Sequence, residues 1–129
     1  MFKLSKRSTK RLQGTDPRIS EIVQLALTIT RVDFGIPEYG GMRSMTAQNL
    51  MFTKGLSKCD GVELLSKHQS GTAFDVFAYV DGKASWDSND MTRVAAAILQ
   101  AASILRYPLE WGGHWKLWQD MPHFQLKLT

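Results

Sequence analysis

Residues 66–80 read SKHQSGTAFDVFAYV and change partway from a polar loop to an apolar strand. The second half, Thr72 to Val80, is rich in the aromatic and β-branched residues that favour strands. Because apolar side chains occupy most of its positions, we expect both faces of this strand to be covered. Asp81-Gly82 follows directly and is typical of a two-residue hairpin turn, which predicts a return strand over residues 83–86.

Helical periodicity flanks this hairpin on both sides. Thr15-Asp16-Pro17 is typical of a helix start, and apolar residues then recur at helical spacing to about Arg31. A second helix is predicted from Thr46 to Lys54, with Gly55 as its C-terminal cap. After the hairpin, a long helix capped by Ser88 or Asn89 should run to about Arg106.

The remaining segments are short and strand-like, over residues 33–39, 108–111 and 123–128. Helices and antiparallel strands in separate blocks predict an α+β fold, with a mostly antiparallel sheet and helices packed on it. With 129 residues, 43% of them hydrophobic, the chain can form one compact domain. We expect that domain to span residues 15–129, after a basic, solvated N-terminal arm over residues 1–14.

Composition narrows the classes of function. The net charge of +4 favours polyanionic partners, but the helix that starts near Arg18 carries cations only at its two ends, Arg18 and Arg31. A nucleic-acid partner is therefore not expected. Cys59 is the single cysteine, which excludes an intrachain disulfide and a cysteine metal cluster. The basic opening lacks a following apolar stretch and no segment is long enough to span a bilayer, so synthesis in the cytoplasm without an export signal is expected.

The sequence has three histidines, His68, His114 and His123. His68 lies in the polar loop, Asp75 in the strand that follows it, and His123 at the start of the last strand. Two imidazoles and one carboxylate suit a catalytic zinc ion, because three protein ligands leave a fourth position for water. Asp120, three residues before His123, could take a proton from that water. Spacing alone favours a polar loop histidine, a buried hydrogen-bonded acid and a strand-end histidine over a metal site.

The context of these residues resembles a known family. Residues 66–75 match S-x-H-x-x-G-x-A-x-D, which is similar to the first zinc motif of the D-alanyl-D-alanine carboxypeptidase (VanY-type) metallopeptidases. That family includes small phage endolysins that cut the L-alanyl-D-glutamate bond. Residues 111–115 and 120–125 resemble the family's closing segment, and residues 41–48 and 55–61 resemble its arginine-containing turn and following helix. The similarity covers roughly residues 15–128, in the same order.

The resemblance implies a role for each of several side chains. His68, Asp75 and His123 would bind one zinc ion per chain, at a cleft on the sheet edge. Asp120 would be the general base and then the general acid. Arg43 would face the scissile carbonyl or a substrate carboxylate, where a guanidinium stabilises negative charge. The resemblance also implies that Ser66 and Gln48 bind substrate.

Three positions differ from the family's usual pattern. Many relatives have glutamate where this chain has Asp120, and His114 stands where relatives often have aspartate. His114 is either a further ligand, a substrate contact or simply an exposed side chain. Gln125 occupies a position where carboxypeptidases tend to carry an ionisable residue, which favours the endolysin branch. The tryptophans near this segment are either core anchors or stacking platforms for substrate.

The sequence thus predicts a zinc-dependent peptidase that hydrolyses stem peptides of bacterial peptidoglycan. Either an L-Ala-D-Glu endopeptidase or a D-Ala-D-Ala carboxypeptidase fits, and a phage lysis endolysin is the expected setting. The alternative is a non-catalytic, zinc-bearing module of the same fold that binds the cell wall. Peptidoglycan is the expected partner, without stable membrane insertion, and the protein is expected to be a monomer that reaches the wall after release through the inner membrane.

Overall fold

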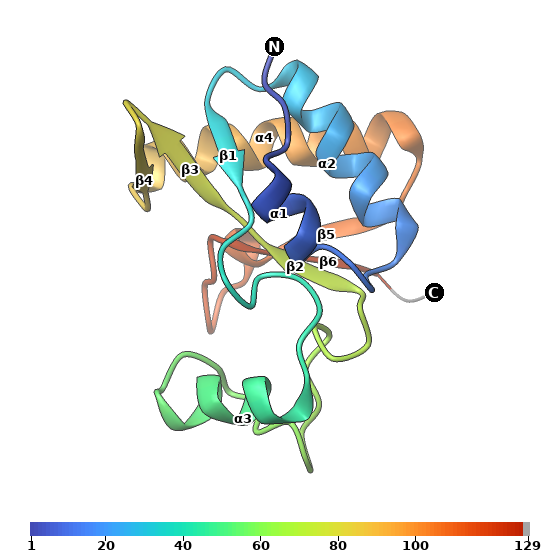
Figure 1. Cartoon of the computed structure of the whole chain (residues 1–129), viewed down its shortest axis with the longest axis vertical. Helices are drawn as coiled ribbons and strands as arrows, with labels where there is room; N and C mark the ends of the chain where they lie inside the picture. Colours follow the sequence, from blue (N-terminus) through green and yellow to red (C-terminus); the bar gives the residue numbers. More distant parts are fainter. Residues whose placement is uncertain (128–129) are drawn as a thin grey trace.

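The computed structural model describes residues 1–127, and Leu128 and Thr129 lie outside the described part. Within this part the chain forms helices and short strands in mixed order (Figure 1). The helices are α1 (Lys6–Arg11), α2 (Pro17–Ile29), α3 (Met45–Thr53), α4 (Ser88–Leu105) and the short 3-10 helix η1 (Gly112–His114). The strands are β1 (Asp33–Gly35), β2 (Ala73–Asp75), β3 (Phe77–Val80), β4 (Lys83–Ser85), β5 (Leu109–Trp111) and β6 (His123–Leu126).

Two antiparallel sheets form the β part of the described chain. One has the strand order β1-β3-β4 and the other β2-β6-β5. The α+β class with antiparallel pairing is confirmed, but the strand predicted from Thr72 to Val80 is wrong as a single element. It breaks at Val76, whose N–H donates to Pro122 O rather than to a ladder partner. The chain passes there from one sheet to the other, a change that its uninterrupted apolar composition did not reveal.

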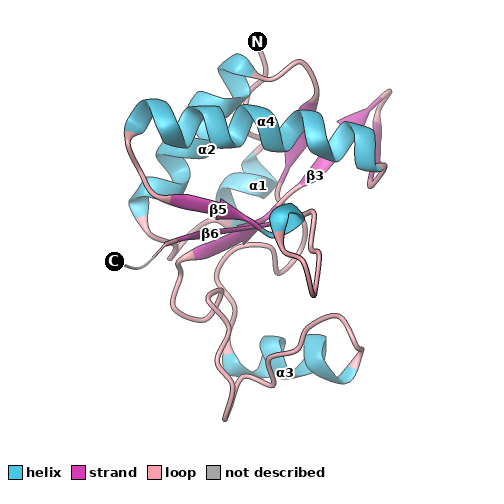
Figure 2. Ribbon diagram, turned by 180° about the vertical axis from the view of Figure 1, so that it is seen from behind, coloured by secondary structure: helices cyan, strands magenta, loops and turns pink. Residues whose placement is uncertain are grey.

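The helices α2 and α4 form the main layer that covers the sheets. Both views show them together at one end of the molecule, with α3 at the opposite end and the strands of the β2-β6-β5 sheet between (Figures 1 and 2). The helix α4 also contacts β3 and β5, one strand from each sheet. The apolar faces of these elements make one buried core, which includes Ile19, Ile22, Leu27, Phe74, Met91, Ile98, Phe124 and Leu126.

Helix starts follow the predicted chemistry, with one shift in position. Asp16 caps α2 by accepting the N–H of Arg18 ahead of Pro17, as predicted. The cap of α4 is Asp87, which accepts from the N–H groups of Asn89 and Asp90, so the prediction of Ser88 or Asn89 was wrong by one or two residues. All three residues have capping side chains, and only the backbone geometry selects among them.

The N-terminal segment contains a helix that the sequence pattern did not indicate. Ser8 of α1 is buried, and its hydroxyl Oγ accepts the N–H of Ile36. Leu12 joins the hydrophobic core and Arg11 donates to Ile36 O. A boundary between an arm and a domain at residue 14 stays a prediction, but residues 8–12 pack against the rest of the chain.

The described residues include no helix that is both long enough and apolar enough to cross a membrane.

Candidate metal centre and active site

Strand pairing brings two of the candidate ligands together. In the β2–β6 ladder, Asp75 is the direct partner of His123. Side chains of directly opposed residues lie on the same face of a sheet, so the carboxylate and the imidazole become neighbours. His123 Nδ1 lies 3.1 Å from Asp75 Oδ1. Two residues 48 positions apart are thus brought together by backbone pairing alone.

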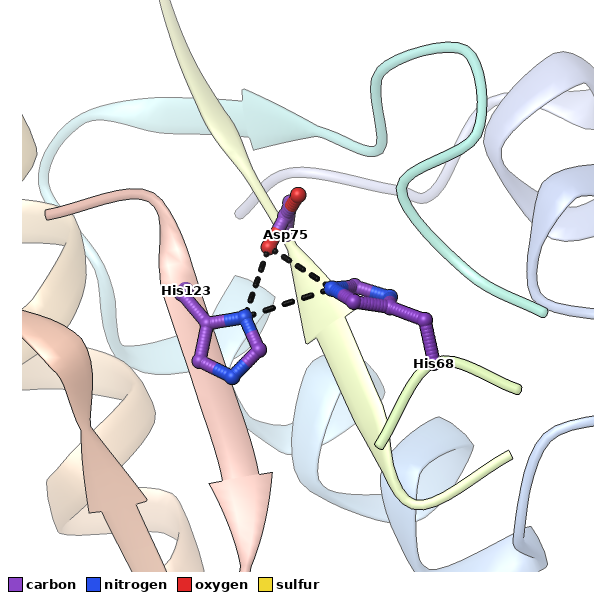
Figure 3. Close-up of side chains that lie close together, drawn as sticks. All are labelled: His68, Asp75 and His123. Carbon is purple, nitrogen blue, oxygen red and sulfur yellow. Dashed lines mark hydrogen bonds and ion pairs between the residues drawn. The ribbon is translucent and has the colours of Figure 1, made fainter. Parts of the chain in front are cut away.

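The third candidate ligand comes from the loop before β2. His68 Nε2 lies 3.2 Å from Asp75 Oδ1 and 3.2 Å from His123 Nδ1, so the three atoms form a nearly equilateral triangle (Figure 3). A local turn sets the position of His68, because Ser66 Oγ accepts its backbone N–H. The His68 side chain is 2% exposed, so it is enclosed by the residues around it.

The main chain at Gly41 orients the His68 ring. His68 Nδ1 lies 2.9 Å from Gly41 O, and a carbonyl oxygen can only accept, so Nδ1 carries the proton. In the neutral imidazole, Nε2 then presents a lone pair to the triangle. Gly41 must be a glycine here because a Cβ would overlap Arg11 O at the end of α1. The close approach of the two segments places this carbonyl against His68.

The geometry and chemistry of this group fit a divalent metal ion. Around a tetrahedral zinc ion with bonds of roughly 2.0–2.1 Å, neighbouring ligand atoms lie about 3.3 Å apart. The three edges of the triangle, at 3.1–3.2 Å, are close to that value. Within residues 1–127, His68, Asp75 and His123 are the group of histidine, cysteine and acidic side chains whose ligand atoms converge in this way. Nitrogen and carboxylate donors suit zinc and neighbouring transition metals.

Charges at the site keep Asp75 ionised. Burial raises the pKa of Asp75, but His68 and His123 lower it by more, and the net pKa lies well below the usual range. Burial lowers the pKa of His123, while Asp75 raises it, and the net change is upward. The Asp75 carboxylate beside the two imidazoles therefore carries a negative charge, as a carboxylate metal ligand must.

Arg43 and Gln48 form a buried layer behind Asp75. Arg43 Nη2 donates to Asp75 Oδ2 at 2.9 Å, Nη1 donates to Gln48 Oε1, and Nε donates to Tyr39 O. Burial lowers the pKa of Arg43, and the charges of Asp75 and Asp120 oppose this change. Arg43 reaches the cleft, whereas Gln48 is 0% exposed and its amide group is used entirely by Arg43, Ser57 and Cys59. Gln48 thus does not line the cleft, and its role as a substrate-binding group stays a prediction.

Asp120 lies on the turn that leads into β6. Its carbonyl accepts the N–H of His123, and its side chain lines the same cleft as the three candidate ligands. Burial and the charge of Asp75 raise the pKa of Asp120, with His123, His68 and Arg43 opposing. A carboxyl group with a raised pKa in a cleft is a candidate for proton transfer.

A cleft of about 730 Å³ opens over the triangle. Ser66 lines it, and its role as a substrate-binding group stays a prediction. The lining of the cleft also includes apolar side chains, namely Met51, Leu56, Leu65, Trp86, Trp115, Trp118 and Pro122. The cleft thus combines the polar candidate ligands with apolar surface, which is typical of a site for an organic substrate.

The tryptophans divide between core and cleft, and His114 belongs to neither. Trp111 is buried in the core and donates its indole N–H to Met121 O, whereas Trp86, Trp115 and Trp118 line the cleft. His114 is exposed and packs edge-on against Trp111, outside the triangle and the cleft. Of the two roles weighed for the tryptophans, Trp111 takes the core role and the other three are free to contact substrate.

The sequence alone did not point to Tyr39, which lines the cleft beside Arg43. Its φ of 62° is in the left-handed region, which a residue with a large side chain rarely adopts. The bond from Arg43 to its carbonyl helps to hold this conformation. The adjacent Gly40-Gly41 pair marked a turn, but not the conformation of the residue before it.

Three comparisons place the chain among known proteins. A family model described as phage L-alanyl-D-glutamate peptidase matches residues 1–126. The L-alanyl-D-glutamate peptidase of Escherichia phage T5 is 32% identical over 133 aligned residues, covering 98% of this chain and 90% of that protein. The crystal structure of Serratia marcescens L-Ala D-Glu endopeptidase ChiX superimposes with a TM-score of 0.84 at 36% identity, over 97% of this chain and 90% of that one.

Proposed function

This chain belongs to the phage L-alanyl-D-glutamate peptidase family, and we propose that it hydrolyses the bond between L-alanine and D-glutamate in peptidoglycan stem peptides, using one zinc ion. The observation that carries this proposal is the triangle of His68, Asp75 and His123 at the floor of the cleft. Membership of the family supports the reaction and the substrate. The donor set of the triangle supports the metal.

The three residues of the triangle are proposed to hold zinc through His68 Nε2, Asp75 Oδ1 and His123 Nδ1. When bound, zinc supplies a Lewis acid that lowers the pKa of a water ligand to roughly 7. The protein fixes the three donors in advance, since each ligand is buried or hydrogen-bonded on its far side. Little reorganisation is then needed when the ion enters.

Asp120 is proposed as the group that moves protons. Its carboxylate accepts a proton from the attacking water, and the resulting carboxylic acid delivers that proton to the nitrogen of the departing D-glutamate amine. The raised pKa of Asp120 supports this role, because it narrows the gap between the pKa of the carboxyl group and neutral pH. Asp120 can therefore act first as the general base and then as the general acid.

Arg43 is proposed to stabilise negative charge in the cleft. Its contact with Asp75 Oδ2 leaves Oδ1 toward the imidazoles, so one role is to hold the carboxylate in place. The predicted role at the scissile carbonyl remains part of the proposal, because Arg43 also lines the cleft. Ser66 is proposed to contact substrate through its remaining hydrogen-bonding capacity.

Two other functions that the sequence allows compete with this proposal. A D-Ala-D-Ala carboxypeptidase would use the same metal chemistry, but the two relatives named above are both described by the L-Ala-D-Glu bond. A non-catalytic wall-binding module would need no proton carrier. The raised pKa of the cleft residue Asp120 favours the enzyme.

The test is mass spectrometry of fragments released from purified peptidoglycan. We expect peptides with a new N-terminal glutamate, and we expect a chelator to abolish their release. Fragments that differ only by loss of a terminal D-alanine would replace the proposal with a carboxypeptidase. Release of no fragment by zinc-loaded, folded protein would favour the binding module.

The proposed setting is phage lysis, with the protein made in the host cytoplasm and released through the inner membrane. The match to a phage family supports this setting. Cells that express the protein should lyse after their inner membrane is permeabilised with chloroform and should remain intact before it. Lysis on expression alone would show that the protein reaches the wall without help.

A further inference from the structure

A chain of hydrogen bonds runs from His123 away from the metal triangle. His123 Nε2, on the ring edge opposite Nδ1, lies 2.9 Å from Gln125 Oε1. Gln125 Nε2 donates to Glu110 Oε1 at 2.7 Å. The three residues share one face of the sheet, since His123 and Gln125 are two apart on β6 and Gln125 pairs directly with Glu110 on β5.

Glu110 determines which groups donate and which accept in this series of hydrogen bonds. An ionised carboxylate accepts hydrogen bonds and donates none, so Glu110 must receive the NH₂ group of Gln125. The carbonyl oxygen of the same amide then faces His123, and it also can only accept. His123 Nε2 must therefore carry a proton, which leaves Nδ1, the nitrogen beside Asp75, as the ring nitrogen that can bind a metal ion.

The two imidazoles are thus oriented by different devices. The main-chain carbonyl of Gly41 holds His68. His123 is held by the hydrogen bonds from Gln125 to its ring and from Gln125 to Glu110, which we call the relay. A main-chain contact is insensitive to most substitutions, but the relay depends on the identity of both Gln125 and Glu110. Partners of this kind fix the tautomer and rotation of a ligand and commonly change metal affinity about 10–100-fold when removed.

We propose that Glu110 and Gln125 are positioning residues that set the tautomer and ring orientation of His123 for metal binding, an inference that rests on the proposed metal role of the triangle. Neither residue belongs to the triangle, and their contact with it runs through His123, while Gln125 also lines the cleft. The simpler reading is a polar cross-strand pair that stabilises the sheet. The two readings differ because only the relay requires a particular order of donors and acceptors.

Substitutions that remove or reverse the relay separate these readings. Gln125→Leu removes the acceptor for His123 Nε2 while keeping much of the side-chain volume. The double substitution Glu110→Gln with Gln125→Glu exchanges the two groups, so that residue 110 can donate to residue 125 and residue 125 still accepts from His123. Gln119→Leu is the matched control, because Gln119 donates to Gly113 O and lies outside the relay.

The main measurement is the zinc dissociation constant of each purified protein, from competition with a chelator of known affinity. We expect Gln125→Leu to weaken zinc binding about 10–100-fold, while the double exchange and Gln119→Leu stay within about threefold of the unaltered chain. The melting temperature of zinc-free protein shows whether each variant is folded. Unchanged affinity in Gln125→Leu, or an exchange variant as weak as Gln125→Leu, would overturn the inference.

A second measurement does not depend on any variant or on zinc. The ¹⁵N shifts of the imidazole nitrogens of His123, taken in zinc-free protein at alkaline pH, report which nitrogen is protonated. A proton on Nε2 agrees with the relay, whether or not Nδ1 also carries one toward Asp75, and an Nε2 without a proton overturns it. If the unaltered chain bound no zinc, the proposed function would fail, yet this measurement would still test the relay by itself.

Discussion

Asp75 is the residue at which the metal centre and its support meet. Its Oδ1 faces both imidazoles, and its Oδ2 accepts from Arg43. The sequence motif pointed to Asp75 as a ligand but gave no sign that the two oxygens have different partners. Such detail depends on Arg43, which lies 32 residues away along the chain.

Asp75→Asn should abolish tight zinc binding. The amide is a poor zinc ligand, and it removes the negative charge that balances the cation, so we expect affinity to fall by a factor on the order of 100 or more. Chelator competition measures this loss. Asp33→Asn is the matched control, because burial raises the pKa of Asp33 and the residue lies on β1, outside the cleft. Asp33→Asn should keep its zinc and, since burial disfavours the charge, should not lose stability at neutral pH.

Asp120→Asn should separate binding from catalysis. An amide cannot carry the proton, so we expect kcat to fall about 10²–10⁴-fold while zinc content and melting temperature stay unchanged. Equal activity in the variant would remove Asp120 from the mechanism.

The pH dependence of the unaltered chain follows from the same residue. Asp120 must be ionised to accept a proton, and burial raises its pKa, so activity should decline as pH falls through a value above that of an ordinary aspartate. The acidic limb of kcat against pH measures this decline. An acidic limb that persists unchanged in the residual activity of Asp120→Asn would assign it to another group.

Elements were predictable where local chemistry decides them. Asp16 before Pro17 marked the start of α2, and Asp81-Gly82 marked the β3–β4 hairpin. The break at Val76 was not predictable, because it depends on Pro122 O accepting the N–H of Val76 from a distant segment. The helix α1 was missed because its sequence is polar and its buried face is small.

The cap of α4 gives a test at this scale. Asp87→Ala removes the acceptor for two backbone N–H groups and should lower the free energy of unfolding by about 1 kcal/mol. Urea denaturation measures the change, and Asp87→Asn should restore most of it because asparagine caps equally well. Peptidase activity should be unaffected in both variants, since Asp87 lies outside the cleft.

The segment between β1 and α3 should be intolerant of a side chain at Gly41. The added Cβ in Gly41→Ala would overlap Arg11 O and displace the carbonyl that holds His68. We expect a loss of about 1–3 kcal/mol in stability together with weaker zinc binding. Gly82→Ala is the control, because that glycine has open space around it. Its positive φ costs stability but leaves the metal centre untouched, so weaker zinc binding there would contradict the account.

At the scale of the whole molecule, the sheets gather residues from distant parts of the chain around one cleft. The motif of residues 66–75 and the segment of residues 120–125 were recognisable in the sequence as a family pattern. Their convergence could not be derived from spacing, since it depends on the β2–β6 register that pairs Asp75 with His123. The supporting contacts of Gln48, Gly41 and Gln125 depend on the tertiary fold in the same way.

Zinc should stabilise the folded chain as a whole, because the triangle exists only when the sheets and the His68 loop are formed. At a free zinc concentration 1,000 times the dissociation constant, the gain is about 4 kcal/mol. Thermal melting with and without a chelator measures this effect. His68→Ala should melt at the same temperature in both conditions, and a zinc-dependent shift in that variant would place the ion elsewhere.

The most direct test is to titrate metal-stripped protein with zinc and measure the rate at which it releases peptides from peptidoglycan. The rate should be near zero at the start, rise in proportion to added zinc and level off at one ion per chain. A metal-stripped protein that already works at its full rate would contradict the account, and so would His68→Ala or Asp75→Asn following the same curve.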